Sequence, residues 1–431
     1  MRSHLTVGAM LASVATVAAN AGCAADSLNN WYCSAVDSIA YTNFGSSGTY
    51  QEVTSINGGS CTQGEKAYGG PLAPLNGEVS WHFRGPLVLK QFAVYTLGSE
   101  EKKRNIKPSL HERRHGHAHL HKRKEKRAVG DIVTATIDGQ VVTWVNEWAG
   151  GAAPTPAAEV EDGGKSGNSK AYKAASSAPA SDDRKPAAPI NAGKGKWGRQ
   201  AYYNAQAGTA DGLTFLNHFG GDKSGVFDYD LGNSLSYASK DALSGCASPE
   251  VLEDKMIPDN VEVILMSDKK CNGDCGAVRP GTVAYHGFEG ESKLFLLELS
   301  MPLTGKKGWN EDMPAAWILN AAIPRTLQYG KPECSCWKTG CGEFDVLEIL
   351  DSGNTRAKST LHGNISGGDS YYFNRPTDGL IKVAVVFNAL TSSAHIKILD
   401  DDVEFGPTVD ATNVSKFCEK SAKNSIFTLG S

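Results

Sequence analysis

Residues 341–350 read CGEFDVLEIL, a stretch that places Glu343, Asp345 and Glu348 among apolar, strand-forming residues. Successive side chains of a β-strand point to opposite faces, so Glu343 and Asp345 share one face while Glu348 falls on the other. A β-bulge between Asp345 and Glu348 adds one residue to this alternation and brings Glu348 back to the first face. The stretch therefore predicts a bulged strand that carries three acids on one face and Phe344 in the core.

Three acids on one strand face suit glycoside hydrolysis. A retaining glycosidase needs two carboxyl groups, one as nucleophile and one as acid/base. A third acid between them can hydrogen-bond the nucleophile and keep neighbouring protonation states apart. The alternative is a solvated strand whose acids occur by chance. The ExDxxE spacing alone does not separate these two interpretations.

The sequence around this strand, residues 197–431, is rich in apolar runs that favour β-structure. Gly-, Pro- and Asp-rich turns separate these runs, which include VEVILM (261–266), KLFLLELSM (293–301), LIKVAVVFN (380–388) and AHIKILD (394–400). Many strands with few helical periods predict a β-sandwich or jelly roll over these residues.

The upstream part of the chain divides by composition. Residues 1–21 predict a secretory signal peptide, because a positive charge precedes a short apolar run that ends at small residues. Residues 22–98 alternate apolar and polar side chains and predict a small, separate β module. Residues 128–148 predict an isolated hairpin around an Asp-Gly turn. Residues 149–196, rich in Ala, Pro, Gly, Ser and Lys, predict a flexible stalk.

Residues 99–127 form a basic, His-rich segment. Positions 100–127 carry eleven Lys and Arg against four Glu, together with five of the eleven histidines. A run this polar cannot bury enough surface to fold by itself. Nucleic-acid binding, metal binding by its histidines, binding to wall polyanions and proteolysis at its dibasic pairs are competing interpretations. In a secreted chain we favour an exposed linker that proteases cut.

The cysteines and sequons fit an oxidising, secretory compartment. Ten cysteines in a secreted chain predict disulfides. Three lie in 22–98 and seven in 197–431, so neither set can pair completely within itself. Either one bridge joins the two parts or each part keeps a free thiol. We favour the bridge, with Cys23 as the partner on the N-terminal side. Asn364 and Asn413 begin sequons for N-glycosylation.

Several function classes are disfavoured by composition. The formal net charge of −4 argues against a nucleic-acid binder. Beyond the signal peptide, the sequence shows no segment that could span a bilayer, so we expect no membrane association. We expect no organic cofactor and no metal site. A structural calcium ion would be compatible with a β-sandwich, but the sequence shows no ligand motif for it.

Two neighbouring motifs carry a resemblance to a known family. PAAWIL (314–319), followed by GEFDVLE (342–348), resembles the PAxWxL…GEIDxxE signature of laminarinase-type retaining β-glucanases. Phe344 replaces the usual aliphatic residue, and the cysteine-bounded loop CSCWKTGC (334–341) is not part of the general signature. Together with the Gly-rich N-terminal region, the chain is similar to the Tos-one-like glycosyl hydrolases of fungal cell walls.

The resemblance implies a fold and a set of site residues. The expected fold is all-β: a C-terminal jelly-roll β-sandwich of the laminarinase or concanavalin type, with a small N-terminal β module. Glu343 would be the nucleophile, Asp345 its assistant and Glu348 the acid/base. Trp317 would line the sugar cleft, and we add Trp337 and His362, which lie close to the motifs, as candidate substrate contacts.

The expected function is that of a secreted fungal cell-wall endo-β-1,3-glucanase, whose partner is the β-1,3-glucan of the wall. Two alternatives remain open. A glucan transglycosylase would use the same carboxylates and differ only in whether sugar or water resolves the covalent intermediate. A non-catalytic wall-glucan-binding or structural protein would have kept the fold alone.

Overall fold

The computed structural model describes residues 22–97, 132–137, 140–145 and 191–430, with backbone alone for the second and third of these ranges. The expected signal peptide, the basic linker and most of the stalk lie outside the described residues. Strands β8 (Ile132–Ile137) and β9 (Gln140–Val145) pair antiparallel, with Ile132 opposite Val145.

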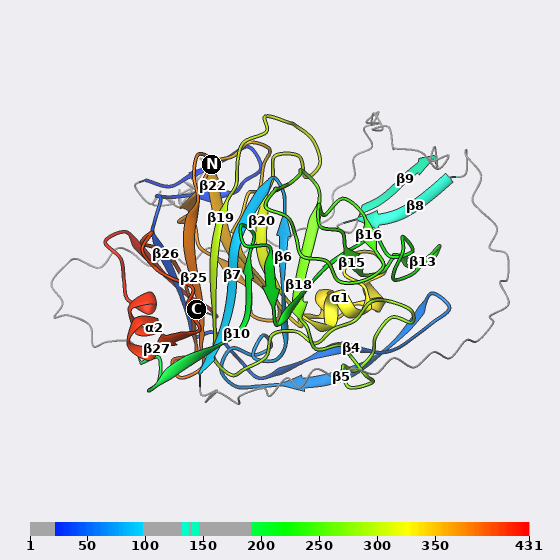
Figure 1. Ribbon diagram of the computed structural model, residues 1–431, viewed down its shortest axis with the longest axis horizontal. Helices are drawn as coiled ribbons and strands as arrows, with labels where there is room; N and C mark the ends of the chain where they lie inside the picture. The colour runs from blue at the N-terminus through cyan, green and yellow to red at the C-terminus, as the bar shows by residue number, and fades with distance from the viewer. Residues whose placement is uncertain (1–21, 98–131, 138–139, 146–190, 431) are drawn as a thin grey trace, which may run out of the picture.

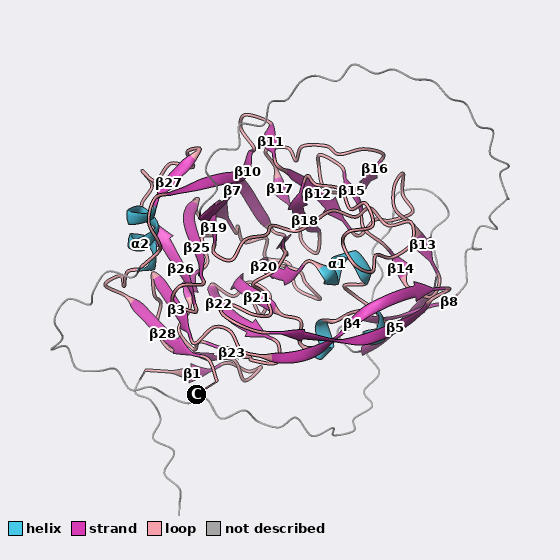
Figure 2. Cartoon of the chain, turned by 90° about the horizontal axis from the view of Figure 1, so that it is seen from below, coloured by secondary structure: helices cyan, strands magenta, loops and turns pink. Residues whose placement is uncertain are grey.

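Two ten-stranded sheets form the body of the protein (Figures 1 and 2). We call the one that contains residues 343–348 the acid sheet. Its strands, in spatial order, are β16 (Gly245–Cys246), β15 (Ser236–Ala238), β12 (Leu213–Asn217), β18 (Glu262–Ser267), β6 (Val79–Arg84), β20 (Ala315–Asn320), β21 (Glu343–Glu348), β22 (Arg356–His362) and β23 (Gly367–Gly368), with β24 (Phe373–Asn374) also paired to β22.

The second sheet, which we call the supporting sheet, lies against the first. Its strands, in spatial order, are β11 (Thr209–Asp211), β10 (Lys196–Asn204), β7 (Leu87–Leu97), β19 (Lys293–Ser300), β25 (Ile381–Asn388), β26 (Ser393–Leu399), β3 (Ser38–Thr42) and β28 (Asn424–Thr428), with β17 (Met256–Ile257) paired to β7 and β27 (Thr408–Asp410) paired to β10. The remaining elements are the pairs β1 (Ala24–Ala25) with β2 (Trp31–Tyr32), β4 (Gly48–Asn57) with β5 (Ser60–Tyr68), and β13 (Phe227–Asp228) with β14 (Gly232–Asn233), and the short helices α1 (Ala322–Thr326), α2 (Ala411–Cys418), η1 (Pro332–Cys334) and η2 (Trp337–Thr339).

The main core lies between the two sheets. Phe344 of the acid sheet meets Phe387 of the supporting sheet, with ring centroids 5.9 Å apart, and Trp81 meets Phe295 at 5.3 Å. The other face of the supporting sheet is covered by α2, whose Val414 is fully buried in a second cluster. Because β19 and β25 are covered on both faces, their sequences read as nearly continuous apolar runs. The all-β sandwich prediction is confirmed.

Three strands from residues 22–97 are built into the two large sheets. β6 lies between β18 and β20, β7 lies between β10 and β19, and β3 lies between β26 and β28. Strands with both edges hydrogen-bonded to C-terminal strands, and with side chains in the shared core, belong to one folding unit. This corrects the expected division into a separate N-terminal module, because alternation along a strand does not reveal which strands are its neighbours.

One boundary and one disulfide partner also need correction. Residues 191–196 belong to the folded body and not to the stalk, since Ala192 is buried and its carbonyl accepts a hydrogen bond from Trp197. A disulfide does join the N-terminal and C-terminal parts, as expected, but it is Cys61–Cys334. Cys23 pairs instead with Cys33 across the β1–β2 pair, where strand pairing holds the two residues close together.

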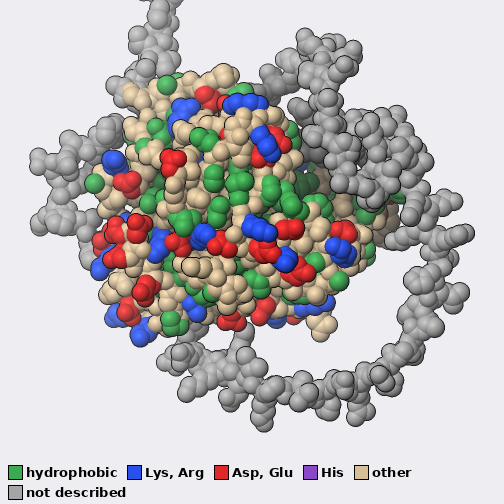
Figure 3. All heavy atoms as spheres, turned by 45° about the horizontal axis from the view of Figure 1, so that its top comes forward, with side chains coloured by type: hydrophobic (Ala, Val, Ile, Leu, Met, Phe, Trp, Pro, Cys, Tyr) green, Lys and Arg blue, Asp and Glu red, His purple; other side chains and the backbone are tan. Residues whose placement is uncertain are grey.

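The other cysteines are divided between local bridges and buried thiols. Cys271 pairs with Cys275 and Cys336 with Cys341, while Cys246 and Cys418 are buried and unpaired. Among the described residues, none of the helices has the length and apolarity needed to cross a membrane. The face in Figure 3 intersperses acidic and basic side chains, with no broad surface of one sign.

Candidate active site

The acid-bearing strand β21 contains the predicted bulge. Against β20, Trp317 lies opposite Asp345 and Ala316 lies opposite Leu347, which leaves Val346 without a partner. Against β22 the same register shift falls between Asp345 and Glu348. The extra residue therefore sits at the position that the spacing of the acids required, and this prediction is confirmed.

The bulge sorts the side chains of β21 onto two faces. Phe344, Val346 and Leu347 all belong to the core between the sheets. Residues opposite each other in an antiparallel pair share a face. Glu348 and Ala315 are such a pair. All three acids therefore share the face that carries Ala315, and that face is turned away from the supporting sheet.

Glu343 and Asp345 form a pair of acids, of which Asp345 is buried and Glu343 is partly exposed. Asp345 is only 4% exposed, and its Oδ2 lies 3.0 Å from Nε2 of His362. Trp337 donates its indole N–H to Oε2 of Glu343. Burial raises the pKa of both carboxyl groups, and the neighbouring charge of Asp345 raises the pKa of Glu343 further. Repulsion between two like charges on one strand face favours a state in which the pair holds one proton.

Glu348 has a different environment. Its Oε1 lies 3.7 Å from the Arg84 guanidinium, and its side chain is partly exposed. Arg84 is oriented by a 2.9 Å hydrogen bond from Nε to the carbonyl of Met313 and lies 5.8 Å from the Trp317 ring centroid. The face thus combines the Glu343–Asp345 pair with a third acid beside a fixed cation.

The aromatic residues predicted for the site occupy two different positions. Trp337 is 47% exposed, on η2 inside the Cys336–Cys341 loop. Trp317 is only 5% exposed, and its ring stacks on His82 with centroids 5.2 Å apart. Trp317 therefore offers little ring surface to a sugar, which differs from the expected cleft-lining role. The buried Trp317 ring instead belongs to an apolar cluster on the face that carries the acids.

A hydrogen-bonded network beside the acids was missed by the sequence analysis. Glu262 accepts from His82 Nδ1 at 2.7 Å, from Gln328 Nε2 at 2.9 Å and from the Tyr329 hydroxyl at 2.8 Å. Burial works against ionisation, but these donors and the charge of His218 lower the pKa of Glu262 to about 2. Burial lowers the pKa of His82. The two-residue spacing of His82 and Arg84 in WHFR was the available signal, but it lies far from the acids in sequence.

The predicted glycosylation positions are both exposed but lie in different regions. Asn364 follows β22, and its Nδ2 donates a 2.9 Å hydrogen bond to the carbonyl of Thr49 on β4. Asn413 lies on α2, against the supporting sheet. Their modification stays a prediction.

One group among the described residues has the composition of a metal site. It consists of Cys271, Cys275 and His286. Both thiols are consumed by the disulfide between them, so this group has no thiolate to offer a metal ion.

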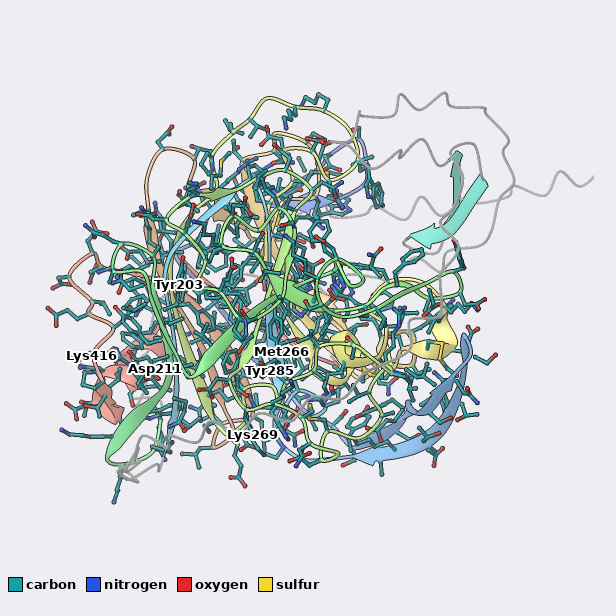
Figure 4. All side chains as sticks on the ribbon, turned by 45° about the vertical axis from the view of Figure 1, so that its right-hand side comes forward. Tyr203, Asp211, Met266, Lys269, Tyr285 and Lys416 are labelled. Atoms are coloured by element: carbon teal, nitrogen blue, oxygen red, sulfur yellow. A yellow bond between two sulfur atoms is a disulfide. The ribbon has the colours of Figure 1, made fainter. Side chains whose placement is uncertain are left out.

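The face of the acid sheet that carries the acids is apolar at the end away from them. Met266 and Tyr285 (Figure 4) are members of the apolar cluster that covers this end.

Comparison with known proteins places the chain in a family. A family model described as "Cell wall protein YJL171C/Tos1, C-terminal" matches residues 195–417, and its N-terminal counterpart matches residues 37–97. The chain belongs to this Tos1 family of cell wall proteins. The family resemblance seen in the sequence is thereby confirmed. No solved structure matches the chain.

Three similar proteins match over most or all of the chain. A protein of Arthroderma benhamiae, named "Probable circularly permuted 1,3-beta-glucanase", is 48% identical over 450 residues that span all of both chains. Proteins of Candida albicans and Saccharomyces cerevisiae, both named "Probable circularly permuted 1,3-beta-glucanase TOS1", are each 39% identical. The match covers 99% of both chains for the former and 92% of both for the latter.

Proposed function

We propose that the protein is a secreted endo-β-1,3-glucanase that remodels wall glucan by a retaining double-displacement mechanism. The family assignment and the names of the relatives support a glucanase of the cell wall. The observation that carries the mechanism is the bulge of β21, because it brings Glu348 onto the face of Glu343 and Asp345. A non-catalytic strand has no need of this arrangement.

In the first step, Glu348 would protonate the glycosidic oxygen while Glu343 attacks the anomeric carbon, which forms a covalent glycosyl-enzyme. In the second step, Glu348 would accept a proton from water, which hydrolyses the intermediate. The charge of Asp345 favours the shared proton on Glu343, so attack by Glu343 would require that proton to move to Asp345 and leave Glu343 ionised. The indole N–H of Trp337 would stabilise that carboxylate from the other side.

The sheet topology agrees with the words "circularly permuted" in the names of the relatives. β3, β6 and β7, from the first hundred residues, lie among strands from the last two hundred and forty. β6 in particular supplies His82 and Arg84 to the face that carries the acids. The active face would therefore need both parts of the chain, whether or not the linker between them is cut.

The direct test is the release of reducing ends from laminarin by the purified protein. Wild type and Asp351→Asn, a control that removes an exposed acid outside the site, should both release them, whereas Glu343→Gln should not. An inactive wild-type protein with a normal melting transition would contradict the proposal. The chain lengths formed from a defined oligosaccharide separate hydrolysis from transglycosylation, since only transglycosylation gives products longer than the substrate.

A further inference from the structure

The loop of residues 327–334 is attached to the protein at nearly every side chain. Leu327 is buried in an apolar cluster, Gln328 binds Glu262, and Lys331 donates to the carbonyl of Gly59. Cys334 closes the loop through its disulfide to Cys61 on β5. A surface loop with this many attachments holds one conformation, because each attachment removes freedom that the loop would otherwise keep.

Tyr329 is the aromatic side chain of this loop, and its ring keeps an exposed surface. It is 43% exposed, although its hydroxyl is fixed by a 2.8 Å hydrogen bond to Oε2 of Glu262. Its ring makes a T-shaped contact with His218, with centroids 5.4 Å apart. Burial of the hydroxyl and the charge of Glu262 raise the pKa of Tyr329 well above its usual range, so the hydroxyl remains a donor. The ring is thus held still and left open to solvent.

Glu262, which holds this ring, lies on the same sheet face as the acids. Glu262 on β18 is opposite Arg84 on β6, Arg84 is opposite Ala315 on β20, and Ala315 is opposite Glu348 on β21. Figure 1 shows β18, β6 and β20 side by side. Three strand spacings separate Glu262 from Glu348, roughly 14 Å. An oligosaccharide that crosses the strands at the acids would reach Tyr329 with a unit removed from the cleaved bond.

Glu262 is suited to hold the ring and not to react. Its two oxygens already accept three hydrogen bonds, from His82, Gln328 and Tyr329. A carboxylate saturated in this way keeps its donors in place but has little capacity left to take a proton from substrate or water.

We propose that Tyr329 is a sugar-stacking platform that selects for longer β-1,3-glucan chains, and that Glu262 is its positioning residue. This inference rests on the proposed glucanase function of the same face. Sugars present apolar C–H faces to flat rings, and a ring whose orientation is already fixed loses less freedom on binding. The platform would add affinity for chains long enough to reach it and none for shorter ones.

The test compares binding of laminaritriose and laminarihexaose by calorimetry, with every variant made in the inactive Glu343→Gln background. Tyr329→Ala should bind laminarihexaose roughly tenfold more weakly, about 1.4 kcal/mol, and laminaritriose unchanged. Tyr329→Phe keeps the ring but loses the hydroxyl, so its affinity for laminarihexaose should fall between those of wild type and Tyr329→Ala. Leu390→Ala, which removes exposed apolar surface from the turn between β25 and β26, is the matched control and should change neither affinity.

A double-mutant cycle tests the positioning role. Glu262→Ala should reproduce the loss seen for Tyr329→Ala, and the two together should cost no more than either alone, because both remove one platform. Additive losses would assign Glu262 a separate role and overturn its assignment as a positioning residue. In the active protein, Tyr329→Ala should raise KM for laminarihexaose and leave kcat unchanged.

Failure of the two proposals can be distinguished. If wild type cleaves laminarin but Tyr329→Ala binds both oligosaccharides as Leu390→Ala does, the platform is refuted and the glucanase function stands. If the background protein binds neither oligosaccharide and wild type releases no reducing ends, both proposals fall. Equal weakening for both oligosaccharides would mean that Tyr329 acts at the acids themselves, which also overturns the platform.

Discussion

Replacement of Asp345 by Asn should make the protein more stable while it lowers activity. Asp345 is 4% exposed, and burial raises the pKa of this carboxyl and of Glu343. Its Oδ2 lies 3.0 Å from Nε2 of the half-exposed His362. Asn keeps the shape of the side chain and removes the buried titratable group. The variant therefore separates the stability cost of the acid pair from its chemistry.

The sign of the expected stability change follows from proton binding by the folded and unfolded states. A folded state with raised carboxyl pKa values retains protons that the unfolded chain has already lost above about pH 4, so wild-type stability falls as pH rises from there through the folded pKa values. Each unit of pKa shift corresponds to about 1.4 kcal/mol. The substitution removes the pKa shift of Asp345 and relieves part of the pKa shift of Glu343. We therefore expect the free energy of unfolding of Asp345→Asn to exceed that of wild type by about 1–3 kcal/mol at pH 7.5 and by almost nothing at pH 4.

Thermal unfolding of wild type, Asp345→Asn and the exposed control Asp351→Asn between pH 4 and 8 measures this effect. A gain of this size should raise Tm by a few degrees at pH 7.5, since about 2–4 °C accompanies each kcal/mol in domains of ordinary size. A Tm difference that is independent of pH, or an Asp345→Asn protein that is less stable at pH 7.5, would contradict the claim that the buried Asp345 carboxyl destabilises the folded protein. Laminarin hydrolysis by the same variant should fall.

Three further predictions concern other parts of the structure. Glu348→Gln should lose activity on laminarin but keep it on aryl glucosides with activated leaving groups, because only the acid step is missing; equal loss on both would remove Glu348 from that role. Phe344→Ala should cost about 3–5 kcal/mol in chemical denaturation, because it leaves a cavity between the sheets; a cost below about 1 kcal/mol would place the ring elsewhere. Cys61→Ser with Cys334→Ser should lower stability by up to about 5 kcal/mol, because that bridge closes a loop of 273 residues. Protein cut after residue 127 should run as one species on non-reducing gels only when this bridge is present.

The sequence contained enough to predict the local structure of the acid strand. Alternation along CGEFDVLEIL, together with the chemistry of three acids, required one extra residue between Asp345 and Glu348, and the registers on both sides of β21 contain it. Phe344 was placed in the core for the same reason. These predictions succeed because a strand's faces depend on its own residues.

Long-range placement could not be predicted in the same way. β6 reads as an ordinary amphipathic strand, and nothing in its sequence shows that it pairs with β18 and β20. His82, Glu262 and Tyr329 come from distant parts of the chain and meet only through that pairing. Trp317 was expected to face sugar, but its burial depends on how His82 and Arg84 pack across it. Cysteine parity favoured a bridge between the two parts of the chain, but the partner depended on the pairing of β1 with β2.

The stereochemistry of the first product tests the central claim most directly. Proton NMR of the newly formed reducing end, recorded before mutarotation, reports whether the anomeric configuration survives cleavage of a β-1,3-glucan oligosaccharide. Double displacement through Glu343 predicts the β anomer as the first product. Initial formation of the α anomer would show a single displacement by water and would contradict the assignment of Glu343 as nucleophile.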